Sequence, residues 1–455
     1  MDDRLDLMDQ GSFLGLRALG HQPCTYLTWV YDRPVDLDAL ERFNERLAGT
    51  LLGRLVQPSP VPGGRHRWVA LDAVPPIEVE PTPRPRAAIQ DWTDELGERG
   101  LDPEHGPGWR LGVLPLDDGG IAVTLATGHT LGDGMAKLQA IADAVRGVRR
   151  RPDHPVRGTV RRRDVLWSDL FDLVRSLPSV VRAVVAGVRV ARTEPSGAKR
   201  GREWRKDARH SASGGRIRAT RGQGGRYRAP AACVRVEQSA WDAAAERLGG
   251  TSNTLVAAFA ATLAQRLGRT DAQGRVTLAV PVSTRVEGDT RGNALDSVQV
   301  VVDPSGLDRD LTRLRAATKA ALAGRAGRAH DVTAVLPLVP LTPRFVVRAG
   351  EGLAMGSGSR PVGCSNHGDV DHPVLRIDGA DPDDFWVRLA EPGQSVADLD
   401  RIGGQLYVLS GRALGRVYLS VAAHRVGVAL DRGGLHAHVA AALADLGLTA
   451  AVATG

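Results

Sequence analysis

The residues of this chain best suited to chemistry are a histidine and an aspartate that follow an apolar run. Residues 121–128 carry no charge and predict a fully buried strand, and apolar residues at helical spacing resume at Met135. His129 therefore lies in the connection between a strand and a helix. A neutral imidazole at such a position could take a proton from a hydroxyl, amine or thiol that attacks a carbonyl group.

Two roles are open to Asp133, which follows His129 by four positions. It could orient the His129 ring, or it could turn away and brace the loop through an arginine, and the flanking glycines favour bracing. Gly132 and Gly134 remove side chains where backbone or substrate must come close. The plainer alternative is a loop histidine followed by an aspartate that caps the next helix.

This turn, GHTLGDG at residues 128–134, resembles the HHxxxDG motif of the CoA-dependent acyltransferase superfamily. That superfamily includes nonribosomal peptide condensation domains and wax ester synthase/diacylglycerol acyltransferase-like enzymes. Gly128 stands where the family usually has its first histidine, and His129 matches the second, which is the catalytic one. The resemblance implies that His129 is catalytic, that Asp133 gives structural support and that Gly134 belongs to the site.

Further segments resemble the same superfamily over most of the 455 residues. Asn253 lies in TSNTLVAA, which resembles the Asn-Asp segment of the wax ester synthase branch, with Thr254 in place of the aspartate. Residues 276–285, VTLAVPVSTR, resemble the strand with its PVSxR element, and Asn293 follows after Gly292. Residues 364–370, CSNHGDV, resemble the late Ser-Asn-x-Gly segment, whereas the DFGWG signature of the plant branch is missing.

The supporting residues that this comparison implies each have a simpler alternative. A buried Asp133 needs a cation, because an unpaired buried charge costs several kcal/mol, and Arg285 is the expected partner. Asn253 could instead be only the N-cap of an Ala-rich helix, and Ser283 could simply end a strand. The donor to a tetrahedral oxyanion could be a backbone amide of residues 132–134, Ser283 or Asn366.

Length and composition favour two domains in a cytoplasmic protein. The chain has 455 residues with 42% hydrophobic content, more than one ordinary core holds. It has no run of eighteen apolar residues, and its first ten residues are acidic, unlike a signal peptide. We expect neither a disulfide nor a metal, because three scattered cysteines and four late histidines lack ligand spacing: Cys24, Cys233, Cys364, His367, His372, His436 and His438.

The net charge of +7 and the pI near 9.7 do not predict a nucleic-acid-binding protein. Arginine is concentrated between residues 146 and 228, with no interleaved aromatic platform and no nucleic-acid motif. These arginines could attract the phosphates of CoA or of a carrier protein's phosphopantetheine arm.

Residues 164–190 predict one or two amphipathic helices interrupted near Pro178. Such a basic helix could lie on an anionic membrane or pack on the body of the protein, and packing is the favoured reading. Residues 193–228 are rich in Gly, Ser, Arg and Lys and predict an exposed crossover. We therefore expect an N-terminal half at residues 1–192 that carries HxxxDG, the basic crossover at 193–228, and a C-terminal half at 229–455.

The remaining patterns predict α/β structure in both halves. The resemblance implies two chloramphenicol-acetyltransferase-like domains arranged as a V, with an interface tunnel in which donor and acceptor meet at His129. Beside the motif strand we expect a helix at residues 37–48, a helical region at 241–267, a final helix at 435–448, and strands at 27–32, 66–72, 276–285, 297–302, 405–410, 416–424 and 425–430.

Together these observations predict an acyltransferase that forms an ester or amide and moves a group other than an aminoacyl group. The donor would be an acyl thioester, either acyl-CoA or an acyl group on phosphopantetheine, and it is a substrate rather than a bound cofactor. The acceptor would be a small molecule with a hydroxyl or amine, and an acyl or peptidyl carrier protein is a candidate partner. The alternative is a non-catalytic condensation-like module that recruits a carrier protein; a serine hydrolase is disfavoured because no GxSxG elbow is present.

Overall fold

The computed structural model describes residues 3–151, 153–193, 227–325, 334–348 and 361–452, with the side chains of the long helix α5 described as far as residue 186. The helices are α1 Leu7–Leu19, α2 Leu37–Leu47, η1 Arg86–Ala88, α3 Ile89–Glu98, η2 His129–Leu131, α4 Gly134–Arg146, α5 Arg162–Thr193, α7 Gln238–Arg247, α8 Ser252–Arg266, α9 Thr312–Ala323, η3 Leu336–Leu341, α12 His372–Leu375, α13 Val396–Arg401 and α14 Arg432–Asp445. The strands are β1 Cys24–Tyr31, β2 Arg54–Gln57, β3 Arg67–Ala70, β4 Ile77–Val79, β5 Trp109–Pro115, β6 Ile121–Gly128, β7 Ala231–Glu237, β8 Val276–Ser283, β9 Leu295–Val302, β10 Val362–Asp369, β11 Asp384–Ala390, β12 Gln405–Ala413, β13 Arg416–His424 and β14 Ala451–Val452.

The first sheet has five strands in the order β11-β1-β6-β5-β4, with the motif strand β6 at its centre. Strand β6 has the predicted bounds and is buried along nearly its whole length. It runs antiparallel to both β1 and β5. Because β6 is held on both edges, the turn that follows it begins from a fixed position.

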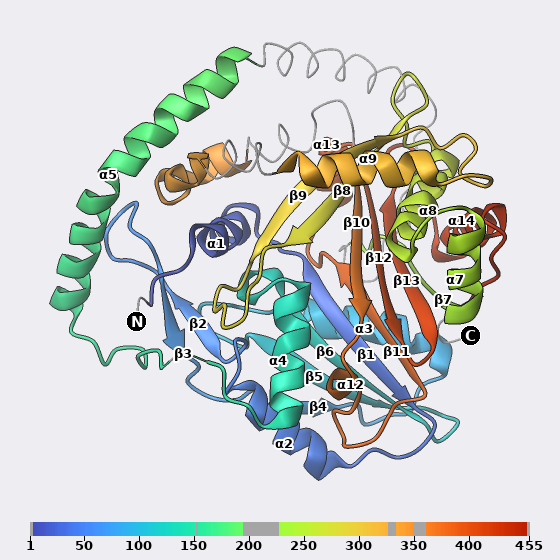
Figure 1. The fold of residues 1–455 in the computed structure, drawn as a ribbon. Coiled ribbons are helices and arrows are strands. Elements are labelled where there is room, and N and C mark those ends of the chain that lie inside the picture. The colour runs from blue at the N-terminus through green and yellow to red at the C-terminus, as the bar shows by residue number, and fades with distance from the viewer. Residues whose placement is uncertain (1–2, 152, 194–226, 326–333, 349–360, 453–455) are drawn as a thin grey trace.

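The second sheet has seven strands in the order β14-β7-β13-β12-β10-β8-β9. Helices α7, α8 and α14 lie beside one another along this sheet (Figure 1). The Ala-rich helix α8 is buried on nearly all sides, which is possible because small side chains let it pack closely between the sheet and α14. The mixed α/β architecture expected from the sequence is confirmed.

One strand crosses the expected boundary between the halves. Strand β11, from the C-terminal part of the chain, pairs antiparallel with β1 at the edge of the first sheet. The two sheets also touch here, since the rings of Phe385 on β11 and Tyr418 on β13 lie 6.0 Å apart, edge to face. The division at residue 192 stays a prediction, and residues 194–226 of the crossover expected at 193–228 lie outside the described residues.

Two local expectations about the C-terminal half are wrong. Residues 425–430 form a turn rather than a strand, because Gly427 takes a positive φ of 71° and directs the chain toward α14. Asn253 is not the N-cap of α8. Thr251 has that role, with an extended backbone and a hydroxyl that accepts from the amide of Thr254, so Asn253 lies inside the first turn.

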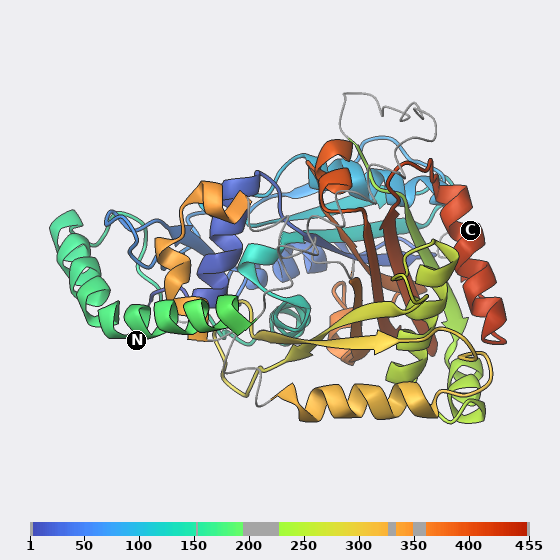
Figure 2. The same cartoon turned by 90° about the horizontal axis from the view of Figure 1, so that it is seen from above.

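Helix α5 is one continuous helix, and the interruption expected near Pro178 is wrong. Proline lacks an N–H and therefore cannot donate to the preceding turn. Neighbouring carbonyls receive other donors: the Ser176 hydroxyl donates to Leu173 O at 2.7 Å and the Ser179 hydroxyl to Ser176 O at 2.6 Å. The helix lies at the periphery of the molecule, away from both sheets (Figures 1 and 2).

Candidate active site

His129 begins the short turn that joins β6 to α4. Its amide donates to Pro23 O at 2.9 Å, which ties the turn to the residue before β1. Its carbonyl accepts from the Gly132 amide at 3.2 Å and from the Asn293 side chain at 3.2 Å. The backbone of His129 is thus held from the strand, from the turn itself and from the C-terminal half.

Asp133 braces the loop through the expected arginine and also caps α4, as the plainer alternative proposed. Its Oδ1 accepts from the Ala136 amide at 2.8 Å. Its Oδ2 accepts from Nη2 of Arg285 at 2.9 Å and from the Ala294 amide at 2.8 Å. The Asp133 side chain is fully buried, and its hydrogen bonds point away from an orienting contact with the His129 ring.

Asn293 connects His129 to a buried carboxylate that the sequence reasoning missed. Its Nδ2 donates to Asp9 Oδ1 at 3.0 Å, and the two oxygens of Asp9 also accept from the amides of Asn293 and Gly292 at 2.6 and 2.9 Å. Asp9 lies on α1 and is fully buried; burial raises its pKa, and the nearby Arg54 charge opposes this rise. No local pattern around Asp9 indicates this contact, because its partners follow 283 and 284 positions later.

Arg54 is a further member of this network, since its positive charge acts on Asp9. Its buried guanidinium donates to Thr290 O at 2.6 Å and lies 3.9 Å from the ring centroid of Trp68. Burial lowers the pKa of Arg54 to about 10. Arg54 therefore contributes a positive charge beside Asp9, while the arginine that pairs with Asp133 is Arg285.

The space of the missing first histidine is occupied by Gln22. A Cβ atom added at Gly128 would lie 2.7–2.8 Å from the Gln22 amide group. Gln22 Oε1 also accepts from the Thr130 hydroxyl at 2.8 Å and from the Thr130 amide at 3.3 Å. A glutamine from the preceding loop thus supports the turn that a histidine at position 128 would otherwise touch.

The electrostatic environment keeps the His129 ring neutral. Burial lowers its pKa to about 4, and the Lys137 ammonium lowers it further, against the opposing effects of Asp133 and of a hydrogen bond to the residue's own backbone. Lys137 is fully buried on α4, where its Nζ donates to the Thr25 hydroxyl at 2.7 Å. Burial lowers the pKa of Lys137 to about 8.

Lys137 was also missed, although a weak signal exists. It is one of only four lysines in an arginine-rich chain. Lysine, unlike arginine, readily changes its pKa when buried. A lysine one turn after the motif therefore indicates a buried charge near the site.

His367, which has no metal-ligand spacing in the sequence, lies beside the motif. An added Cβ at Gly134 would lie 2.4 Å from His367 Nε2, so only glycine fits there. Nδ1 of His367 is 3.1 Å from the Tyr418 hydroxyl. Burial lowers the pKa of His367 to about 4, with a further contribution from Lys137.

The other expected supporting residues have structural partners of their own. Asn366 donates through its side-chain amide to Asn253 Oδ1, which joins β10 to α8. The exposed Ser283 accepts from the Arg285 amide at 3.3 Å and so belongs to the turn that carries this arginine. Their participation at the reacting centre stays a prediction.

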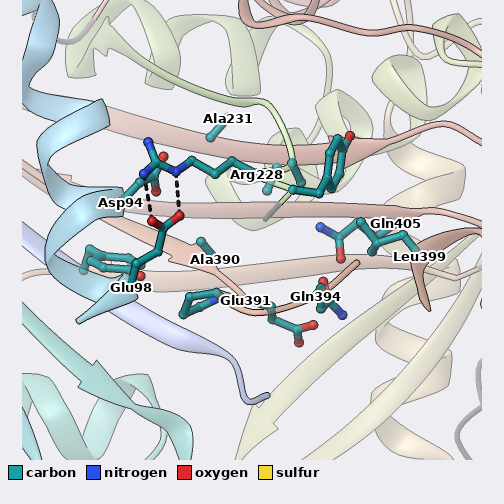
Figure 3. Close-up of a pocket in the computed structure, with 14 residues that line it drawn as sticks. Asp94, Glu98, Arg228, Ala231, Ala390, Glu391, Gln394, Leu399 and Gln405 are labelled. Atoms are coloured by element: carbon teal, nitrogen blue, oxygen red, sulfur yellow. Dashed lines mark hydrogen bonds and ion pairs between the residues drawn. The ribbon is translucent and has the colours of Figure 1, made fainter. Parts of the chain in front are cut away.

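Two adjoining hollows lie where α3 faces the strands of both sheets. Figure 3 shows the first, in which Arg228 donates to both carboxylate oxygens of Glu98 at 2.6 and 2.8 Å, with Gln405 and Glu391 nearby. The second shares Glu98 and Pro392 with the first and is also lined by Gln22 and Cys24. Through Gln22, this second hollow reaches the turn that bears His129.

The fold is shared with solved acyl-transferring proteins. The first condensation domain of the CDA synthetase has a TM-score of 0.57 at 15% identity, with 100% of this chain and 98% of that chain covered. TRI101 of F. sporotrichioides, solved with coenzyme A and T-2, has a TM-score of 0.55 at 13% identity, with 100% of both chains covered. The wax ester synthase/diacylglycerol acyltransferase from Marinobacter aquaeolei VT8 has a TM-score of 0.53 at 16% identity, with 97% and 98% covered.

These structures identify the class of fold. The chain has the fold of a condensation domain, of TRI101 and of a wax ester synthase/diacylglycerol acyltransferase, as the resemblance read from the sequence implied. This chain spans 44% of the length of the nonribosomal peptide synthetase FmoA3, which it also matches. No protein-family model and no curated protein sequence matches the chain.

Proposed function

We propose that this protein is an acyltransferase that moves an acyl group from a thioester to a hydroxyl or amine, with His129 as the general base. The observation that carries the proposal is the way His129 is held: its backbone is fixed by Pro23 and Asn293, while Asp133 is committed to Arg285. The ring is therefore a neutral base at a fixed strand end, in a fold that known acyltransferases share.

The reaction needs one base and no covalent acyl-enzyme. The imidazole of His129 takes the proton of the acceptor O–H or N–H as the oxygen or nitrogen attacks the thioester carbonyl. The resulting tetrahedral intermediate collapses, the C–S bond breaks, and the departing thiolate receives the proton from the imidazolium. Holding both substrates at one base contributes to the rate through proximity.

The oxyanion of the intermediate would be stabilised near the start of α4. The helix N-terminus carries partial positive charge, and Gly134 and Met135 provide the first amides of the helix. Ser283 and Asn366 remain side-chain candidates for this donor. The buried Lys137 ammonium adds a positive charge close to the same helix turn.

The finer architecture that we propose is a V of two chloramphenicol-acetyltransferase-like halves with a tunnel between them. The hollow lined by Gln22, Cys24 and Glu98 supports this arrangement, because Gln22 also accepts a hydrogen bond from Thr130 in the His129 turn. We assign it to one substrate, and the other substrate would approach from the opposite face. The donor would be acyl-CoA or an acyl group on a carrier protein's phosphopantetheine arm.

A panel of donors and acceptors tests the proposal. Wild-type protein would be incubated with short to long acyl-CoA donors and with the same acyl groups on a phosphopantetheinylated carrier protein, each with alcohols and with amines. We expect thiol release that depends on the acceptor, and mass spectrometry of the product separates ester from amide. Binding of the loaded carrier without thiol release from any donor would contradict acyl transfer and favour the non-catalytic module.

A further inference from the structure

Helix α5 is attached to the rest of the protein through its polar side chains. Asp169 is buried, forms an ion pair with Arg67 and accepts from the Ser59 hydroxyl at 2.7 Å. Asp172 lies 3.5 Å from Arg4. The same face also makes apolar contacts, since Val165 and Ala183 are buried and α5 packs against η3. The packing favoured from the sequence therefore combines ion pairs with apolar contacts.

A second set of apolar residues on α5 is exposed. Trp167 and Phe171 are each 68% exposed, and Val181 is 61% exposed. They belong to a series spaced three, four or seven residues apart, which places its members on one face of a helix. We call this face the α5 stripe; its members are Trp167, Phe171, Val174, Val181 and Val185, all exposed.

Arginines flank the α5 stripe. Arg175 and Arg182 are exposed, and residues 161–163 add three exposed arginines at the start of the helix. Among the described side chains of α5 the exposed acid is Asp164, which lies 3.5 Å from Arg163. The outer side of this helix therefore combines aromatic and aliphatic groups with a net positive charge.

We propose that the α5 stripe docks on the surface of an anionic lipid bilayer. Trp167 and Phe171 would enter the boundary between headgroups and acyl chains, and the flanking arginines would bind lipid phosphates. None of the helices in the described part of the chain is long and apolar enough to cross a membrane. Helix α5 would therefore lie in the plane of the membrane surface.

Three features favour a lipid surface over a protein partner. The α5 stripe is exposed on a helix that lies at the periphery of the molecule (Figure 2), whereas peptide-binding sites are grooves. It is continuous from Trp167 to Val185, roughly 27 Å along a helix axis. Its basic flanks complement anionic headgroups, and the whole chain carries a net charge of +7.

Vesicle binding by the full chain tests this proposal without reference to catalysis. Co-sedimentation would use vesicles of phosphatidylcholine alone and vesicles with one third phosphatidylglycerol, at low and high salt. We expect binding to the anionic vesicles that weakens as salt rises. Trp167→Phe should keep binding but remove a blue shift of tryptophan fluorescence, because Trp167 is the residue placed in the lipid.

Paired substitutions identify the surface that binds. Trp167→Ser with Phe171→Ser should weaken binding to anionic vesicles at least about tenfold, and Arg175→Glu with Arg182→Glu should weaken it similarly. The matched controls are Val79→Ser with Val286→Ser, two exposed apolar residues elsewhere, and Arg309→Glu with Arg313→Glu on the C-terminal half. Thermal melts of every variant confirm that each one is folded.

Two outcomes would overturn the proposal. One is equal binding of the α5 variants and the control variants to anionic vesicles. The other is a concentration-dependent dimer in sedimentation velocity that the Trp167 and Phe171 substitutions abolish while wild type ignores vesicles, since the α5 stripe would then be covered by a second copy of this chain.

Discussion

The carboxylate of Asp133 accepts from Arg285 at 2.9 Å, so a residue of the motif turn is bound to the C-terminal half of the chain. Both side chains are largely removed from water. Asp133 follows His129 by four positions and caps α4. The geometry of the site therefore depends on both halves of the chain.

Breaking this ion pair should destabilise the protein strongly. Asp133→Ala leaves the Arg285 charge without its partner and also removes the cap of α4, so we expect a loss of about 3–5 kcal/mol in the free energy of unfolding. Arg285→Ala should cost a similar amount, and the double variant should cost clearly less than the sum. Urea unfolding measures all three.

The control for this experiment is the exposed pair formed by Arg275 and Asp271. Asp271→Ala should change stability by no more than about 1 kcal/mol. Equal melting temperatures for wild type, Asp133→Ala and Arg285→Ala would show that the pair does not stabilise the site.

The side chain of Gln22 should leave no room for a histidine at position 128. Gly128→His restores the usual first histidine of the motif but places its Cβ within 2.8 Å of the Gln22 side chain. We expect overpacking to cost about 1–3 kcal/mol, and Gln22→Ala in the same chain should recover much of it. Gly15→His is the control, because an added Cβ there meets nothing within 4 Å. Failure of Gln22→Ala to rescue Gly128→His would place the strain elsewhere.

Lys137 should set the acid limb of activity. Wild-type kcat/KM should be lost as pH falls through about 4, where His129 becomes protonated. Lys137→Met removes a positive charge that disfavours the imidazolium, so the pKa of His129 should rise and the limb should move to higher pH by about one unit. Histidine NMR titration gives the same pKa without substrate, and Lys319→Met on the exposed face of α9 is the control. An unchanged His129 titration in Lys137→Met would rule out this effect.

His367 should make the fold sensitive to acid. Its pKa is lowered to about 4 in the folded protein against about 6.5 when unfolded. The neutral ring therefore contributes stability that is complete above pH 6.5 and is lost as pH falls toward 4. His367→Gln should flatten this decline by up to about 1.4 kcal/mol per pH unit, whereas the exposed His105→Gln should not. Parallel unfolding curves for wild type and His367→Gln between pH 6.5 and 4 would contradict the assignment.

The local parts of the fold could be predicted because they depend on neighbouring residues. Strand β6 and the Ala-rich helix α8 are buried along nearly their whole lengths, so their sequences are apolar and indicate buried elements. The pairing of Asp133 with Arg285 could be predicted because a buried carboxylate needs a cation and because the family that the sequence resembles pairs the motif aspartate with an arginine in this region. Asn253 was misplaced because Thr251 offered an equally good cap two residues earlier.

The rest of the site depends on contacts distant in sequence. Asp9 reaches Asn293 from the first helix, and His367 reaches Gly134 from the other sheet. Strand β11 joins the first sheet although it follows most of the second sheet in the chain. No periodicity within a short window carries this information. The ion pairs of α5 could not be predicted for the same reason, since Asp172 and Asp169 find Arg4 and Arg67 far away in the sequence.

The most direct test of the account is acceptor-dependent thiol release by wild type and His129→Ala. We predict that kcat/KM falls about 10²- to 10⁴-fold in the variant, as expected when a general base is removed, while its melting temperature stays close to that of wild type. His105→Ala, which removes an exposed histidine, should keep full activity. Undiminished acceptor-dependent release by a folded His129→Ala protein would contradict the role of His129 as the base.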